Sequence, residues 1–160
     1  MSRYAKYINC DLVNGKGVRC TLFFTGCSHG CKGCHNKSIW NPNVGHKVTE
    51  ELIEQILDDL EYRDGLSLSG GDPLHYRNVR TATEICRRVK QRYPDKDIWL
   101  WTGYKLDDDR FRGLEIFWYL DVVIDGKYER NNPTHKPFRG SDNQRMWRFE
   151  GGMPILVVEP

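Results

Sequence analysis

Long apolar segments are absent from this chain of 160 residues, and no run approaches the roughly 20 residues that a membrane-spanning helix needs. The opening residues lack the apolar core of a secretion signal, so we expect no membrane partner and a location in the reducing cytoplasm. The formal net charge of +2 is too small to indicate nucleic-acid binding. Repeats, linkers and low-complexity stretches are also lacking, which predicts a single domain over residues 1–160.

Cysteine is present in an informative arrangement. Three of the six cysteines follow the spacing C-x3-C-x2-C, namely Cys27, Cys31 and Cys34. Four thiolates would close a structural zinc site, whereas three can hold a [4Fe–4S] cube and leave its fourth iron open for chemistry. Zinc with Cys20, His29 or His35 as a fourth ligand is the alternative. Zinc sites commonly pair two ligand knuckles and no second pair occurs here, so the spacing favours the cluster.

The remaining cysteines and histidines are assigned more ordinary places. Cys86 falls on the apolar face of a predicted helix and Cys20 begins an apolar strand, so both are expected in the core. His35 lies beside Cys34 and could contact a ligand of the cluster. Four histidines are expected at the surface: His29, His46, His75 and His135.

Hydrophobic periodicity predicts alternating strands and helices. Strands are expected at Cys20–Phe24, Gly65–Ser69, Ile98–Trp101, Asp121–Asp125 and, less distinctly, Ile155–Val158. Helices are expected after an N-cap at Thr49, over Tyr76–Tyr93, and from an N-cap at Asp107 toward Trp118. This alternation predicts an α/β fold with mostly parallel strands. Because a complete eight-fold barrel takes about 250 residues, we expect a partial, incomplete β/α barrel.

The marked segments of the sequence each follow a predicted strand. They are the cysteine loop, SGGDP (Ser69–Pro73), WTGY (Trp101–Tyr104) and DGKY (Asp125–Tyr128). Parallel α/β folds bind ligands at the carboxyl ends of their strands, so these segments are expected to form one site. Gly70 and Gly71 would let a ligand approach the backbone, and the carboxylate of Asp72 would suit an ammonium group.

These motifs resemble a known family. The C-x3-C-x2-C loop followed by a GGD motif resembles the radical S-adenosylmethionine (SAM) enzymes. Asn14-Gly15-x-Gly17, TGC (Thr25–Cys27), CHN (Cys34–Asn36) and SGGDP are similar to the activating proteins of glycyl-radical enzymes. WTGY, IDGKY (Ile124–Tyr128) and FRGSDNQR (Phe138–Arg145) are similar to the smallest branch, which activates anaerobic (class III) ribonucleotide reductase. The resemblance spans roughly residues 7–148.

The resemblance implies a radical SAM fold with two cofactors, a [4Fe–4S] cluster on Cys27, Cys31 and Cys34, and SAM chelating the open iron. It implies SAM contacts of three kinds. Gly70, Gly71 and Asp72 would hold the amino group. The backbone of Gly33, Cys34 and His35 would contact adenine. The ribose or carboxylate would be contacted from Thr102–Tyr104 and Asp125–Lys127, that is by Thr102, Tyr104, Asp125 and Lys127. Gly33 departs from the family, which often has an aromatic residue there, and His35 or Tyr104 could replace it.

By the same resemblance, one electron would cleave SAM, and the resulting radical would take a hydrogen from a glycine of the reductase large subunit. The electron would come from a donor such as a flavodoxin. The basic segment Lys127–Arg148 is the candidate docking surface for the reductase. Two alternatives stay open at this point. One is a small radical SAM enzyme acting on a pterin-like molecule, of the deazaguanine synthase type, and the other is a zinc-knuckle module that binds nucleic acid.

Overall fold

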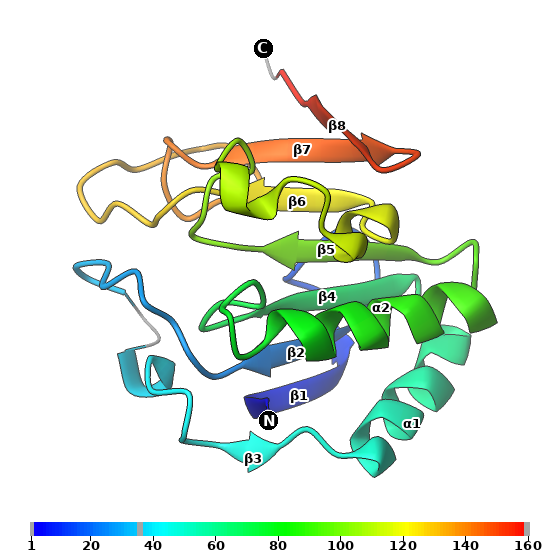
Figure 1. The fold of residues 1–160 in the computed structure, drawn as a ribbon. Helices are drawn as coiled ribbons and strands as arrows, with labels where there is room; N and C mark the ends of the chain where they lie inside the picture. Colours follow the sequence, from blue (N-terminus) through cyan, green and yellow to red (C-terminus); the bar gives the residue numbers. More distant parts are fainter. Residues whose placement is uncertain (1, 35–36, 159–160) are drawn as a thin grey trace.

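The computed structural model describes residues 2–34 and 37–158, and its main feature is one sheet of eight strands (Figure 1). The strand order is β3-β1-β2-β4-β5-β6-β7-β8. The strands are β1 Arg3–Asp11, β2 Arg19–Phe24, β3 His46–Lys47, β4 Gly65–Gly70, β5 Asp97–Trp101, β6 Val122–Asp125, β7 Arg145–Glu150 and β8 Met153–Leu156. The protein is therefore of the α/β class.

The expectation of mostly parallel strands is wrong. The strands β2, β4, β5 and β6 pair in parallel, which gives three parallel pairings. Four other pairings are antiparallel: β1 with β2, β1 with β3, β6 with β7, and β7 with β8. The parallel centre is thus the part that the alternation of strands and helices predicts, and antiparallel strands extend it on both sides.

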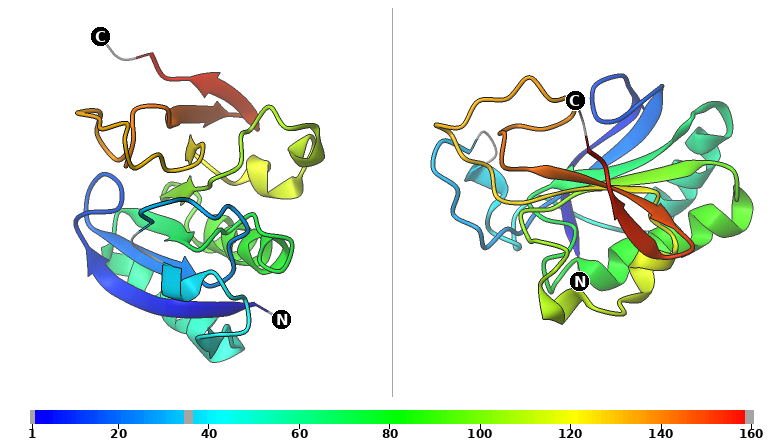
Figure 2. Two further views of the ribbon diagram at one scale, coloured as in Figure 1. Left: turned by 90° about the vertical axis from the view of Figure 1, so that its left-hand side faces the viewer. Right: turned by 90° about the horizontal axis from the view of Figure 1, so that it is seen from above.

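Two helices, α1 (Glu50–Asp59) and α2 (Val79–Arg92), lie against the same face of the sheet (Figures 1 and 2). As predicted, the Thr49 side chain caps α1 by accepting a hydrogen bond from the Leu52 N–H. The apolar sides of both helices pack on buried residues of β2, β4 and β5. Cys20 and Cys86 are both fully buried in this core, as expected. No helix of the described chain is long and apolar enough to cross a membrane.

The helix expected from Asp107 toward Trp118 is replaced by two short 3-10 helices, η3 (Asp109–Phe111) and η4 (Glu115–Trp118). Gly113 lies between them at φ +75°, a left-handed conformation that an α-helix cannot contain. The side chain of Asp108, rather than Asp107, caps η3 by accepting from the Arg110 N–H. The remaining short helices are η1 (Lys37–Ile39) and η2 (Leu60–Tyr62).

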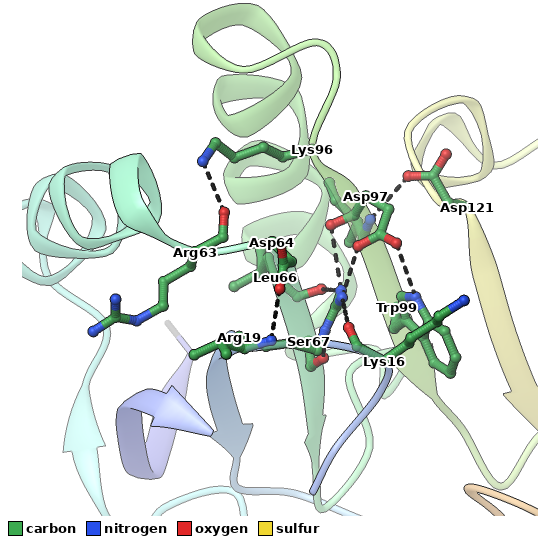
Figure 3. Close-up of polar contacts among 12 residues, drawn as sticks. Lys16, Arg19, Arg63, Asp64, Leu66, Ser67, Lys96, Asp97, Trp99 and Asp121 are labelled. Carbon is green, nitrogen blue, oxygen red and sulfur yellow. Dashed lines mark hydrogen bonds and ion pairs between the residues drawn. The ribbon is translucent and has the colours of Figure 1, made fainter. Parts of the chain in front are cut away.

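A buried arginine joins the amino ends of the parallel strands (Figure 3). The side chain of Arg19, the first residue of β2, is fully buried and forms an ion pair with Asp97 of β5 at 2.7 Å. It also donates to Ser67 Oγ and to the Leu66 carbonyl of β4, and to the Lys16 carbonyl. The segment Asn14–Gly17, quoted above as a motif, is therefore held at the end of the sheet opposite the carboxyl ends.

Candidate functional site

The four marked segments meet at one edge of the sheet, as the sequence predicts. The parallel strands β2, β4, β5 and β6 all end there, and the loops that follow them lie at the left in Figure 1. They enclose a cleft of about 240 Å³. Its lining includes Cys27, Cys31 and Cys34 together with Gly70, Gly71 and Thr102. The thiols and the glycine strand end therefore face the same space.

The cysteine loop is fastened to the GGD segment by backbone contacts. The Gly26 and Cys27 N–H groups donate to the carbonyls of Ile39 and Trp40, and the Asp72 N–H donates to the Gly26 carbonyl at 2.8 Å. A Cβ atom added at Gly71 would lie 2.5 Å from that carbonyl oxygen. Glycine at position 71 is thus required by the close approach of the two segments.

The three thiols of the cleft are the residues that could hold an iron–sulfur cluster. Cys27, Cys31 and Cys34 are partly exposed to the cleft and form no disulfide. Burial raises the pKa of the Cys27 thiol to about 11, so a thiolate there needs a cation such as iron beside it. In residues 2–34 and 37–158, no three or more His, Cys, Asp or Glu side chains are placed to share one metal ion. Cysteines on a cube bind different iron atoms and surround a larger group.

The carboxylate of Asp72 is fully buried beneath the cleft and is surrounded by protein donors. Its Oδ1 accepts from the Leu74 N–H at 2.9 Å, and its Oδ2 accepts from the Gly103 N–H at 2.9 Å. The Thr102 hydroxyl lies 2.9 and 3.0 Å from the two oxygens. Asp72 therefore ties the end of β4 to the end of β5, the strand before WTGY.

Two histidines expected at the surface have buried side chains instead. The side chain of His29 is only 5% exposed, and its Nε2 lies 2.5 Å from Asp72 Oδ2. His75 is buried next to the same segment, where its Nδ1 accepts from the Arg77 N–H. Burial lowers the pKa of His75. Neither histidine lies on a periodic apolar face, so no sequence pattern indicates its burial, whereas His46 and His135 are exposed as expected.

Tyr104 and Lys127, both expected near SAM, line a second cleft of about 1000 Å³. This cleft meets the first one at His29 and Gly103, which line both. The Tyr104 ring packs edge-on against His29 and beside Phe111. Burial raises the pKa of the Tyr104 hydroxyl.

Asp125, at the end of β6, is fully buried and does not carry a free carboxylate. Arg145 Nε and Nη2 donate to its two oxygens at 3.0 and 2.7 Å, and the Leu106 N–H donates to Oδ2. Arg145 belongs to the basic segment Lys127–Arg148 expected to dock a partner. It is instead committed to the buried carboxylate, and it begins β7.

Gly33 lies against the side chain of Arg130, and a Cβ atom at position 33 would be 2.4 Å from Arg130 Cδ. The space that an aromatic residue would take in the family is therefore occupied by this arginine. His35, the other candidate for that place, lies outside the described residues.

Several residues of the cleft come from the late segment FRGSDNQR (Phe138–Arg145), a family motif that was not expected to form part of the site. Phe138, Gly140 and Gln144 line the cleft. Gln144 Nε2 donates to the Gly126 carbonyl, and Trp101 Nε1 donates to the Phe138 carbonyl at 2.8 Å. The residues themselves carry no strong chemical signal, so only their place in a motif could have indicated them.

Comparison with known proteins shows the family to which the chain belongs. Residues 13–147 match the family model described as a 4Fe-4S single cluster domain. The anaerobic ribonucleoside-triphosphate reductase-activating protein of Enterobacteria phage T4 is 48% identical over 152 residues, covering 94% of this chain and 96% of that protein. The proteins of the same description from Haemophilus influenzae and Escherichia coli K12 are 46% and 44% identical, covering 92% and 88% of this chain and 98% and 95% of the relatives.

The protein is thus a single-cluster iron–sulfur protein of the 4Fe-4S class, with three thiols at the carboxyl edge of an α/β sheet. Within that class, the chain belongs to the family of anaerobic ribonucleoside-triphosphate reductase-activating proteins.

Proposed function

We propose that the protein is the activase of an anaerobic ribonucleotide reductase and that it generates a glycyl radical on the reductase large subunit. The observation that carries the proposal is the cleft in which Cys27, Cys31 and Cys34 face Gly70 and Gly71. Relatives that are 44–48% identical over most of their length carry the name of reductase-activating proteins. A radical SAM type of partial barrel is the fold that we infer for the curved sheet.

The three cysteines would hold a [4Fe–4S] cluster by three of its irons and leave the fourth to SAM. When bound and reduced, this cluster would supply the electron that cleaves SAM and so starts hydrogen abstraction from a glycine. A flavodoxin is the class of donor that we propose for this electron. Cluster potentials span about −700 to +450 mV, and reductive cleavage needs the low end of that range.

The chain's own residues would bind and orient the nucleoside. The backbone at Gly70 and Gly71 would contact the amino group, with Asp72 fixing that strand end from below. Thr102 lines the same cleft and would contact the ribose or carboxylate, while the backbone of Gly33 and Cys34 would contact adenine.

The reductase loop would reach the radical through the second cleft, where Tyr104 and Lys127 lie. Asp125 would hold the end of β6 through Arg145. An extended glycine segment suits such an opening because no side chain obstructs its α-carbon.

The test is anaerobic reconstitution with iron, sulfide, SAM, a reductant and the reductase large subunit, followed by electron paramagnetic resonance. We expect a glycyl radical on the reductase with the unaltered protein. Alanine variants of Cys27, Cys31 or Cys34 should give none and retain little iron, because each loses one cluster ligand. Cys10→Ala is the matched control, since Cys10 is exposed outside the cleft.

An iron-loaded protein that cleaves SAM but forms no glycyl radical on the reductase, or that needs a pterin-like molecule instead, would contradict the proposal. Full iron retention by the Cys34→Ala variant would contradict the assignment of the three ligands.

A further inference from the structure

We propose that His29 is a positioning residue that holds the cysteine loop against Asp72, and that the GGD motif acts on the cluster through this histidine. The inference rests on the proposed function, because it concerns the geometry of the same cluster and SAM site. Neither the family description nor the names of the relatives assign a role to His29.

The first observation is the place of His29 in the loop. It lies between Cys27 and Cys31, two of the three proposed ligands, so a contact that fixes His29 acts on the backbone between them. The ring is turned inward and is 5% exposed, although a histidine in a short polar loop would normally face water.

The second observation is that the protein makes room for the ring. A Cβ atom at Gly103 would lie 2.5 Å from His29 Cδ2, so glycine at that position leaves the space that the imidazole fills. Tyr104 also packs edge-on against the ring, with centroids 4.4 Å apart at an interplanar angle of 69°. The ring is therefore held in one orientation by packing as well as by its hydrogen bond.

The third observation is the completeness of the Asp72 environment. Backbone N–H groups and the Thr102 hydroxyl fix the carboxylate to β4 and β5, and the remaining direction on Oδ2 is taken by His29 Nε2. A carboxylate held this way is a rigid acceptor with an orientation set by two strands. The imidazole N–H that donates to it transfers that rigidity to the cysteine loop.

The arrangement resembles the hydrogen bonds that support metal ligands in other proteins, where a buried carboxylate orients a ligand side chain. Mutation of such a supporting residue costs about 10–100-fold in metal affinity or activity. In those sites the histidine binds the metal itself. Here the cysteines are the proposed ligands, and the histidine would act one step away through the backbone between them.

Four variants test the inference. His29→Phe keeps the ring packing but removes the donor, and His29→Ala removes both. His29→Gln places an amide Nε2 donor at a similar reach and should restore the contact. His46→Phe makes the same change at an exposed histidine and is the matched control.

The measurements are made on the anaerobically reconstituted proteins. They are the rate at which a chelator removes iron, the resonance spectrum of the reduced cluster with and without SAM, and the dissociation constant for SAM. We expect His29→Phe and His29→Ala to lose iron on the order of tenfold faster and to show an altered spectrum with SAM. His29→Gln should lie close to the unaltered protein, and His46→Phe should equal it.

Thermal unfolding of the cluster-free variants separates positioning from folding. If His29→Phe lowers the melting temperature but leaves the chelator rate, spectrum and SAM affinity unchanged, the residue is only structural and the inference is overturned. It is also overturned if His29→Gln behaves like His29→Phe. The proposed function fails separately, if the unaltered protein binds no cluster or forms no glycyl radical.

Should His29→Ala not fold, His29→Phe and His29→Gln still decide the matter. Asp72→Asn gives an independent test, because it weakens the same hydrogen bond by changing the acceptor instead of the histidine. The effects of His29→Phe and Asp72→Asn on iron release should then be less than additive.

Discussion

Replacing Arg19 by methionine should destabilise the protein far more than a similar change at an exposed arginine. The Arg19 side chain is fully buried, pairs with Asp97 at 2.7 Å and donates to groups on β4 and the preceding loop (Figure 3). Methionine keeps much of the aliphatic volume and removes all these donors. The carbonyls of Lys16 and Leu66 would then lose their charged partner inside the protein.

The size of the stability loss follows from the Asp97 carboxylate, which the substitution leaves without its partner. Breaking a buried ion pair by removing one partner costs about 3–5 kcal/mol. The Asp97 side chain is 43% exposed, so water can solvate part of it and the lower end of that range applies. A loss of about 3 kcal/mol corresponds to a fall in melting temperature of about 6–12 °C for a chain of this size.

Arg92→Met is the matched control, because Arg92 pairs with Asp58 at 3.0 Å with both side chains largely exposed. Such a pair contributes about 0–1 kcal/mol. The assay is urea and thermal unfolding of the cluster-free protein under anaerobic conditions. Equal losses in the two variants would refute the reasoning that the Arg19 contacts, and not arginine pairing in general, hold the amino ends of the strands together.

Two further outcomes follow from the same part of the molecule. Gly17→Ala should lower the free energy of unfolding clearly more than Gly113→Ala. Both glycines have positive φ, which costs about 1–2 kcal/mol for alanine, but a Cβ at 17 would also lie 2.4 Å from Asp64, whereas one at 113 meets nothing within 4 Å. Equal unfolding midpoints of the two variants would contradict this expectation. Burial of Asp11 opposes ionisation, but hydrogen bonds from Asn14 and Thr21 outweigh it and lower its pKa. The ionised Asp11 carboxylate thus stabilises the fold above about pH 3.9, the pKa of the group in the unfolded chain. This stabilisation is lost as the pH falls through the lower pKa of the folded protein. Urea titrations of Asp11→Asn should show a deficit at pH 7 that shrinks below about pH 4, and a constant deficit would exclude the carboxylate as its cause.

The parallel centre of the fold and the place of the site are readable from the sequence because local signals and global arrangement agree there. Thr49 begins its helix as predicted, and the cysteine loop and the SGGDP segment follow strands that end side by side. Among the flanking strands, β8 (Met153–Leu156) overlaps the strand predicted at Ile155–Val158, whereas β1 and β7 are not predicted. Register shifts interrupt β1, so its side chains do not alternate cleanly. In β7, Arg145 and Arg148 are charged and fall within the predicted basic segment Lys127–Arg148, which hides the strand.

In the site, the sequence indicates which side chains could bind a ligand. It does not indicate which of them are already hydrogen-bonded to other residues of the protein. Asp72 and Asp125 were both expected to contact SAM as carboxylates, yet each is fully buried with protein donors around it. Partners such as His29 and Arg145 lie more than 15 residues away along the chain. Such pairings are decided by tertiary packing, so a strand-end motif alone cannot show them.

These buried carboxylates change how ligand recognition at the cleft must work. With Asp72 and Asp125 engaged by the protein, the described lining of the cleft is made of thiols, backbone, hydroxyl, amide and ring groups, without a Lys, Arg, Asp or Glu side chain. A ligand bearing both an ammonium and a carboxylate would then depend on strand-end backbone groups and on the open iron that we propose. In such a site, precise placement of the cysteine loop would matter more than any charged side chain, because the metal would be the main point of attachment. Contacts that fix this loop, among them the one between His29 and Asp72, would therefore control affinity for SAM by placing the cysteines.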